Sequence, residues 1–224
     1  GSMGTGLLGH RQRSDGSQIE HDEYGDIYDI MGISYTTPNW ADRHMNVNLK
    51  ATLNWIEPQE VATADVDGTY RIYRFDHAAA RTDPAAKLAL RVYNRDGEEF
   101  WISLREAWPN PSFQQSAYIV WTPAGPSAHD LIDSRPLSVP KGSGGAERDD
   151  CALPVGSSWT DPTDSFRITN LGAGGTSPFD YLDLEVAHLP ERAYAELYTT
   201  SGATTPRARR CSPCRTGFAF PAGT

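Results

Sequence analysis

Residues 88–104 read LALRVYNRDGEEFWISL, and this stretch decides the fold class. Apolar side chains alternate with other residues over 88–92 and again over 100–104, a period of two that is typical of half-buried strands. Between the two runs lies Asn94-Arg95-Asp96-Gly97, a turn sequence that ends in glycine. Two alternating runs on either side of an Asp-Gly turn predict an antiparallel hairpin.

Further short runs of this kind extend the β prediction along the chain. They are separated by segments rich in Gly, Pro, Asp and Ser, which favour turns and loops. Many short strands with such connections are typical of a β-sandwich. We therefore expect a mainly β chain with an antiparallel β-sandwich over residues 59–187 and a flexible tail over residues 188–224. The other expected strands are residues 70–75, 117–122, 131–132, 166–171 and 181–186.

One α-helix is predicted ahead of the sandwich. Thr37-Pro38-Asn39 supplies a helix start, because proline fixes φ and asparagine can cap the first turn. From Trp40 to Trp55, apolar residues recur with i, i+3 and i+4 spacing and give one moderately apolar face. Pro58 ends the segment, since proline cannot continue a helix interior.

Charge and composition argue against several classes of function. The 224 residues contain 20 Lys and Arg against 29 Asp and Glu, a formal net charge of −9. Nucleic acids and anionic membrane surfaces require a basic footprint, so neither partner is expected. No apolar run approaches the roughly 20 residues that a membrane-spanning helix requires. The three cysteines, Cys151, Cys211 and Cys214, cannot form a disulfide framework, and their pairing stays open.

A second stretch carries chemical information. Residues 23–32 read EYGDIYDIMG, and the predicted helix closes on Leu53-Asn54-Trp55. This pattern resembles the segment around the Met-turn of gametolysin-like and immune-inhibitor-A-like zinc peptidases, secreted enzymes of the metzincin type whose helix closes on Leu-Gly-Trp. Later segments resemble the same family in the same order, so the similarity covers residues 20–187. These segments are 100–105 (FWISLR), 130–133 (DLID) and 153–159 (LPVGSSW).

The resemblance implies a tight turn whose methionine lies beneath zinc-binding histidines as an apolar floor. Asp29, Met31 and Gly32 would form this Met-turn, because methionine fills irregular apolar gaps and glycine lets the chain turn closely. The resemblance also implies zinc as cofactor, secretion, and a protein or peptide substrate if a complete catalytic domain is supplied. Residues 6–10, GLLGH, resemble the end of the family's zinc motif with a shifted glycine. His10 would then be a remnant of the third zinc ligand; the other interpretation is a solvated loop histidine.

One departure limits the activity that we expect. The family uses a His-Glu-x-x-His helix, in which two histidines bind zinc and the glutamate is the general base. None of the six histidines in this chain is followed by glutamate, and the N-terminal residues have no signal-peptide pattern. Because a catalytic zinc needs three protein ligands, the chain alone should not hydrolyse peptides. Residues 1–58 are therefore interpreted as a truncated or degenerate peptidase segment that holds the Met-turn and the closing helix.

An alternative function belongs to a different class. The chain could be a non-catalytic β-sandwich module that binds protein or carbohydrate. Tyr93, Trp101 and Trp108 would then form an aromatic binding strip, although such residues more often cover one face of a sandwich. Zinc content and casein hydrolysis distinguish this module from a peptidase relative.

Two other motifs have simpler interpretations. Asp65 and Asp67, like Asp161 and Asp164, resemble fragments of calcium-binding loops, but turn chemistry explains both pairs. Residues 211–214, CSPC, have the spacing of a redox motif or half a zinc site. They lie in a Gly-, Pro- and Arg-rich segment, where a disordered tail or a local disulfide is the simpler explanation.

Overall fold

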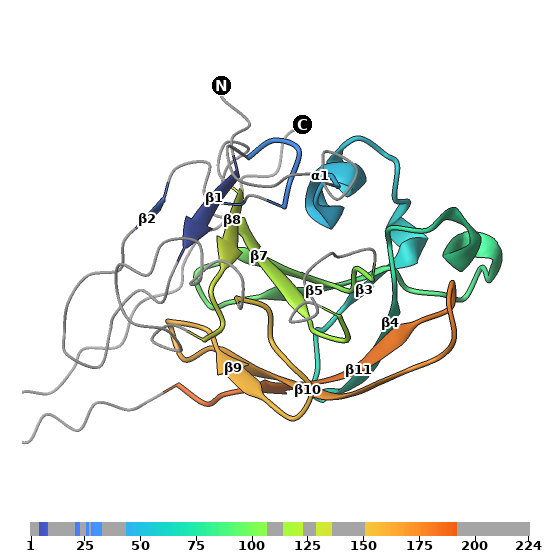
Figure 1. Ribbon diagram of the computed structural model, residues 1–224. Coiled ribbons are helices and arrows are strands. Elements are labelled where there is room, and N and C mark those ends of the chain that lie inside the picture. Colours follow the sequence, from blue (N-terminus) through green and yellow to red (C-terminus); the bar gives the residue numbers. More distant parts are fainter. Residues whose placement is uncertain are drawn as a thin grey trace, which may run out of the picture. The chain divides into compact units, whose positions relative to one another are not determined.

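The computed structural model describes residues 5–8, 21–22, 26, 28–32, 44–106, 114–122, 129–135 and 151–191. Eleven strands and one α-helix lie in these residues, together with two 3₁₀-helices, η2 (Pro58–Glu60) and η3 (Ala78–Thr82) (Figure 1). The chain is therefore mainly β, as the sequence predicts. The described residues up to Glu191 belong to one compact unit. The division at residues 58 and 187 stays a prediction, and nearly all of the expected tail lies outside the described residues.

The larger of two sheets has seven strands, and its centre is antiparallel. Strands β5, β6, β7 and β8 follow one another as antiparallel neighbours, whereas β3 pairs with β5 and β1 pairs with β8 in parallel. The sheet is thus mixed, and the expectation of purely antiparallel pairing is wrong near both of its ends. The strands, in spatial order, are β2 (His21–Asp22), β1 (Thr5–Leu8), β8 (His129–Ile132), β7 (Tyr118–Thr122), β6 (Glu99–Ser103), β5 (Ala89–Tyr93) and β3 (Val61–Thr63).

The hairpin that the sequence predicts joins β5 to β6. Leu90 lies opposite Ile102 and Val92 lies opposite Phe100, so the apolar residues of both strands share one face. The turn is closed by the Gly97 amide, which donates to the Asn94 carbonyl at 3.1 Å. Gly97 has a φ of 77°, a left-handed conformation that glycine adopts without steric cost. The hairpin prediction is confirmed.

The smaller sheet has four strands and is antiparallel throughout. Its order is β4-β11-β10-β9. Along β11, Leu182, Leu184 and Val186 are buried while the residues between them are half-buried, so one face points to a core. The strands are β4 (Gly68–Tyr73), β9 (Ser158–Thr160), β10 (Phe166–Gly174) and β11 (Tyr181–His188).

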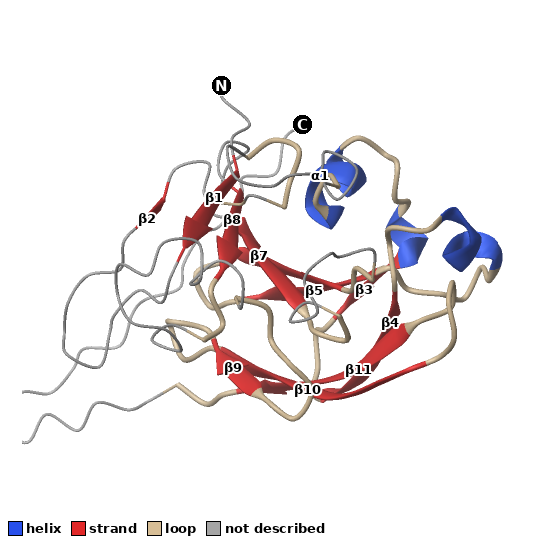
Figure 2. Ribbon diagram, viewed as in Figure 1, coloured by secondary structure: helices blue, strands red, loops and turns tan. Residues whose placement is uncertain are grey.

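The two sheets share one hydrophobic core, and Figure 2 shows their strands in separate layers. Three aromatic rings connect the layers: the Phe100 ring of β6 lies 5.2 Å from the Phe166 ring of β10 and 5.5 Å from the Trp159 ring of β9, centroid to centroid. All three side chains are buried. Burial of large aromatic surfaces is the main term that holds such layers together.

A second core covers the outer face of the larger sheet. Trp101, Tyr118 and Val120 of β6 and β7 pack there with Tyr28 and Val47 from the N-terminal part of the chain. The central strands are therefore buried on both faces, which explains why residues 117–122 and 131–132 are apolar with little alternation. This contact places the segment around residue 28 on the sheet.

The α-helix is shorter than predicted. Helix α1 (Val47–Thr52) has six residues, whereas residues 40–55 were expected. Its end is a Schellman motif: the Trp55 amide donates to the Lys50 carbonyl at 2.8 Å and the Asn54 amide donates to the Ala51 carbonyl at 3.0 Å. Asn54 has a φ of 57°, so the chain leaves the helix there instead of at Pro58. Residues 44–46 are not helical, and residues 40–43 lie outside the described part.

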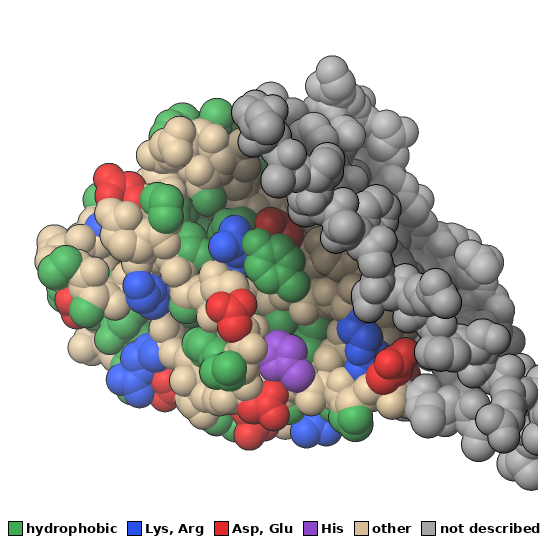
Figure 3. Space-filling model, turned by 180° about the vertical axis from the view of Figure 1, so that it is seen from behind, with side chains coloured by type: hydrophobic (Ala, Val, Ile, Leu, Met, Phe, Trp, Pro, Cys, Tyr) green, Lys and Arg blue, Asp and Glu red, His purple; other side chains and the backbone are tan. Residues whose placement is uncertain are grey.

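No helix in the described part of the chain is both long and apolar enough to cross a membrane. On the face of the molecule in Figure 3, Lys and Arg side chains are interspersed with Asp and Glu side chains.

Candidate functional site

The predicted Met-turn residues form a closed four-residue turn. The Gly32 amide donates to the Asp29 carbonyl at 3.1 Å, so residues 29–32 reverse the chain with Met31 in the third position. The Asp29 side chain supports the reversal, since its Oδ1 accepts the Met31 amide at 2.7 Å. Asp29 is buried, Met31 and Gly32 are half-buried, and Ile30 is exposed.

A second buried carboxylate holds the residues ahead of this turn. Asp26 Oδ1 accepts the amides of Tyr28 at 3.1 Å and Asp29 at 3.2 Å. Its Oδ2 accepts the Asn46 side-chain amide at 2.9 Å and the Tyr118 hydroxyl. Both oxygens of Asp26 are therefore saturated with donors from the protein. The carboxylate connects the turn to β7 and to the residue that precedes α1.

Two further contacts fix the turn on the scaffold. Asp29 Oδ2 accepts the Asn46 backbone amide at 2.6 Å, so the same residue binds both carboxylates. The Arg105 guanidinium, just beyond the end of β6, donates to the Tyr28 carbonyl at 2.9 Å. The turn is thus held from α1, β6 and β7 at once, by groups that are buried with it.

Burial dominates the electrostatics of this cluster. Loss of hydration, together with the nearby charge of Asp26, raises the pKa of Asp29 from 3.8 to about 7. Burial also raises the pKa of Asp26, although its hydrogen-bond donors oppose this change. Burial lowers the pKa of Arg105 and raises the pKa of Tyr118 well above 10. Two carboxylates beside one guanidinium therefore hold a proton more readily than exposed carboxylates do.

The side chains that hold the turn are buried and cannot contact a substrate. Asp26 is completely buried and Asn46 is 1% exposed, so no solute can reach the groups that hold the turn. The part of the turn that faces outward is Ile30-Met31-Gly32. The cluster therefore holds a closed turn on buried hydrogen bonds, with Met31 half-buried at its third position.

No metal centre is found in the part of the chain that the structure describes, where no group of three or more His, Cys, Asp or Glu could hold a metal ion. His10, the predicted remnant ligand, lies outside the described residues, so the zinc prediction stays untested. The cysteines of residues 211–214 also lie outside, and Cys151 is buried.

The two calcium-loop fragments contain aspartates that close loops. Asp161 Oδ1 accepts the Phe166 amide at 2.9 Å and its Oδ2 accepts the Thr163 amide at 3.0 Å, between β9 and β10. Asp67 accepts the His188 amide at 2.7 Å. Loop closure accounts for both carboxylates, and calcium binding stays a prediction.

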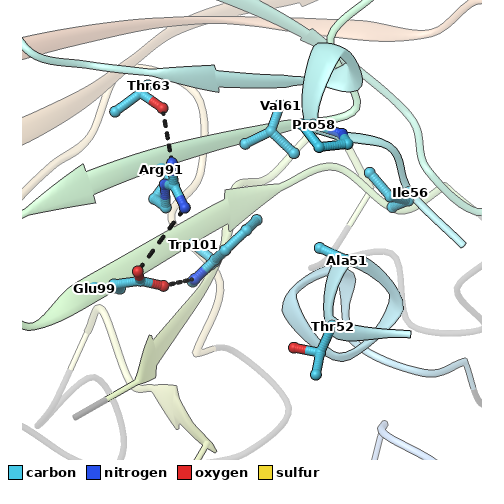
Figure 4. A pocket seen from close by; sticks show the side chains of 9 residues that line it. All are labelled: Ala51, Thr52, Ile56, Pro58, Val61, Thr63, Arg91, Glu99 and Trp101. Carbon is cyan, nitrogen blue, oxygen red and sulfur yellow. Dashed lines mark hydrogen bonds and ion pairs between the residues drawn. The ribbon is translucent and has the colours of Figure 1, made fainter. Parts of the chain in front are cut away.

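A pocket of about 330 Å³ lies between α1 and the outer face of the larger sheet (Figure 4). On its polar side, the Arg91 guanidinium lies 3.9 Å from the Glu99 carboxylate and donates to the Thr63 hydroxyl at 3.3 Å. Glu99 also accepts the Trp101 indole N–H at 2.9 Å. Ile56 and other apolar residues form the opposite side. This combination suits binding of a small group by charge and apolar contact.

The aromatic strip proposed from the sequence is not continuous. Trp101 is 7% exposed, because α1 and its flanking residues cover this face of the sheet. Tyr93 is 38% exposed, and its hydroxyl donates to Glu99 at 3.0 Å. Trp108 lies outside the described residues. What remains is one accessible tyrosine beside the pocket of Figure 4.

Only some of the residues that hold the turn can be identified from the sequence. Asp26 belongs to the quoted stretch of residues 23–32, and Arg105 ends the segment of residues 100–105 that resembles the same family. Asn46 and Tyr118 carried no sequence signal, since they belong to no motif.

Comparisons of the chain with protein-family models, with curated proteins and with solved structures gave no match.

Proposed function

We propose that the chain is the C-terminal portion of a secreted zinc-dependent endopeptidase-like protein, in which residues 29–32 form the floor of the metal pocket and a β-sandwich follows. The observation that carries this proposal is the closed turn with Met31 in its third position, held on buried carboxylates. A polarizable thioether on a rigid support suits the underside of zinc-bound imidazole rings.

The end of α1 supports the same proposal. The family pattern has glycine where this chain has Asn54, and Asn54 adopts a φ of 57°. Only glycine reaches this conformation without cost, and asparagine is the residue that most often replaces it. The substitution therefore preserves the backbone geometry that the family pattern requires at this position.

The position of Arg105 adds a long-range argument. The stretch 23–32 and the stretch 100–105 resemble the same family, and they meet through the hydrogen bond from Arg105 to the Tyr28 carbonyl. If the two resemblances were chance similarities, there would be no reason for the two stretches of chain to lie in contact. Their contact favours one common architecture that joins a peptidase segment to a sandwich.

The chain by itself is proposed to be inactive. Its 224 residues contain no His-Glu pair, so the general base and two zinc ligands must come from elsewhere. The test is to read the coding sequence upstream of Met3 and to express the extended protein. We expect an in-frame His-Glu-x-x-His helix, one zinc per chain and chelator-sensitive casein hydrolysis, while the 224-residue chain cleaves no casein. An upstream sequence without that motif, or casein cleavage by the shorter chain, would contradict the proposal.

The pocket of Figure 4 favours a second candidate function, a non-catalytic module that binds protein or carbohydrate. Its paired Arg91 and Glu99 and the adjoining aromatic residues are groups that recognise peptides or sugars. An array of glycans and matrix peptides tests it, with Arg91→Met as the pocket variant and Arg167→Met, at an exposed position on β10, as the control. Binding that Arg91→Met abolishes and Arg167→Met retains favours the module.

A further inference from the structure

A second cavity, of about 210 Å³, lies between α1 and η3, and its lining includes Lys50, for which the described residues supply no close ion-pair partner. Lys50 extends from α1 into its lining, and no carboxylate of the described residues lies within 4 Å of the ammonium group. The ammonium donates to His44 Nε2 at 3.3 Å and lies 5.0 Å from the centroid of the Phe75 ring. Neither contact neutralises its charge.

The acidic side chains beside this cavity are already engaged in ion pairs with arginines. Asp76, which lines the cavity, accepts both the Nε and the Nη2 of Arg74 at 2.8 and 3.1 Å. Glu60 binds the other cation of the lining, Arg81, through both of its oxygens at 2.6 and 2.7 Å. These bidentate pairs leave Lys50 as the cation of the cavity lining that makes no close ion pair with a described residue, although the charge of Asp76 favours its charged form from a longer distance.

The two histidines of the cavity differ in the ring nitrogen that can donate a hydrogen bond to a ligand. His44 Nε2 accepts from Lys50, so its proton lies on Nδ1, directed to the Met45 carbonyl at 3.4 Å. His77 Nδ1 accepts the Ala79 amide at 3.1 Å, so the ring N–H of His77 is on Nε2. His77 therefore adds a hydrogen-bond donor to the charge of Lys50.

The remaining lining is apolar and limits the size of the ligand. Trp55, Ile56, Phe75 and Leu88 form these walls. The volume is below the range of about 300–1,000 Å³ that holds drug-sized molecules, so a group of a few non-hydrogen atoms fits. One cation without a close ion pair, one hydrogen-bond donor and apolar walls match a monocarboxylate with a small aliphatic body better than a phosphate, which is more strongly hydrated and needs more donors.

We propose that this cavity is a binding site for a small aliphatic carboxylate, in which Lys50 and His77 hold the carboxylate and the apolar walls hold its side chain. Such a carboxylate occurs in a free acid and in the C-terminal residue of a peptide. The site is independent of the proposed zinc chemistry. The electrostatics of the cavity agree with such a site, since burial lowers the pKa of Lys50 to about 8 and that of His44 to about 4.

The test is a binding titration by NMR with the full 224-residue chain at pH 7. The ligands are isobutyrate, isobutyramide, acetyl-Ala-Val, acetyl-Ala-Val amide and inorganic phosphate. We expect isobutyrate or acetyl-Ala-Val to bind with a Kd of about millimolar, given their few atoms, and both amides to fail. The tighter of the two carboxylates identifies the source. Binding of an amide as tight as that of its acid, or phosphate bound more tightly than either acid, overturns the proposal.

Two variants and one spectroscopic readout locate the site. Lys50→Met keeps the apolar stem and removes the charge, and it should weaken carboxylate binding about tenfold or more, because a charge-assisted hydrogen bond is lost. Lys87→Met removes the same charge from a residue outside the cavity lining and should leave the affinity unchanged. Equal weakening by both variants overturns the site. In the wild-type chain, saturation with isobutyrate should raise the pKa of Lys50, measured on its ¹³Cε resonance, and an unchanged pKa contradicts the proposal independently of any variant.

Discussion

The hydroxyl of Tyr118 gives the sharpest test of how the turn is held. It donates to Asp26 inside the protein, and both residues are buried. Tyr118→Phe removes this one oxygen and keeps the ring. A buried acceptor that loses its donor costs about 1–3 kcal/mol, so we expect the free energy of unfolding to fall by about 2 kcal/mol at pH 8. With a urea m-value of about 2 kcal/mol/M, the midpoint should fall by about 1 M.

The pH dependence of this loss follows from the carboxylates. Folding raises the pKa of Asp29 from 3.8 to about 7, so the folded state prefers the protonated pair. The stability contributed by that preference is fully present below pH 3.8 and is lost as the pH rises through about 7. The Tyr118 hydroxyl favours the charged form of Asp26. Removal of the Tyr118 hydroxyl should therefore lower the free energy of unfolding more at pH 8 than at pH 5.

The assay is urea unfolding followed by tryptophan fluorescence at pH 5 and pH 8. Tyr70→Phe is the matched control, because its hydroxyl donates to the Val66 carbonyl at 2.7 Å in an exposed setting and its loss should change stability by less than about 0.5 kcal/mol. A Tyr118→Phe variant that is as stable as Tyr70→Phe at both pH values would show that the hydrogen bond from Tyr118 to Asp26 does not stabilise the protein. A larger loss at pH 5 than at pH 8 would refute the assigned sign.

Three other perturbations test separate parts of the structure by the same unfolding assay. Phe166→Ala, in the core between the sheets, should lower the free energy of unfolding by about 3–5 kcal/mol, and a decrease below 1 kcal/mol would contradict that packing. Asn54→Ala should cost about 1 kcal/mol because of its left-handed backbone, while Asn54→Gly should be neutral or slightly stabilising; equal effects of the two would contradict the assigned conformation. Burial lowers the pKa of His44 from 6.5 to about 4, so the stability should fall as the pH drops through this range. His44→Gln should reduce the change of the free energy of unfolding between pH 6.5 and about pH 4. An unchanged pH dependence would contradict the lowered pKa of His44.

The strands were predictable because their signals are local. Each strand that the sequence predicts within the described residues is a strand in the structure, namely β4, β5, β6, β7, β8, β10 and β11. The short strands β3 and β9 have three residues each, too few to establish a period. Strand β1 pairs with β8, more than 100 residues away in the chain, and no local pattern predicts such a partner.

The site was predictable only where a motif is contiguous. Asp29, Met31 and Gly32 lie in one stretch of sequence, and the turn follows from that stretch. The groups that hold it come from far along the chain: Tyr118 is 92 residues from Asp26, and Arg105 is 77 residues from Tyr28. Their proximity is decided by the order of β6 and β7 in the larger sheet, which the sequence does not specify locally.

The most direct measurement is the position of zinc in a crystal of the N-terminally extended protein, located by anomalous scattering at the zinc edge. We expect a single zinc peak on the open side of residues 29–32, with the Met31 side chain beneath it and imidazole ligands between. An intact fold in which zinc binds elsewhere, or in which no zinc binds at saturating concentration, would contradict the assignment of Met31 as the floor of a metal pocket.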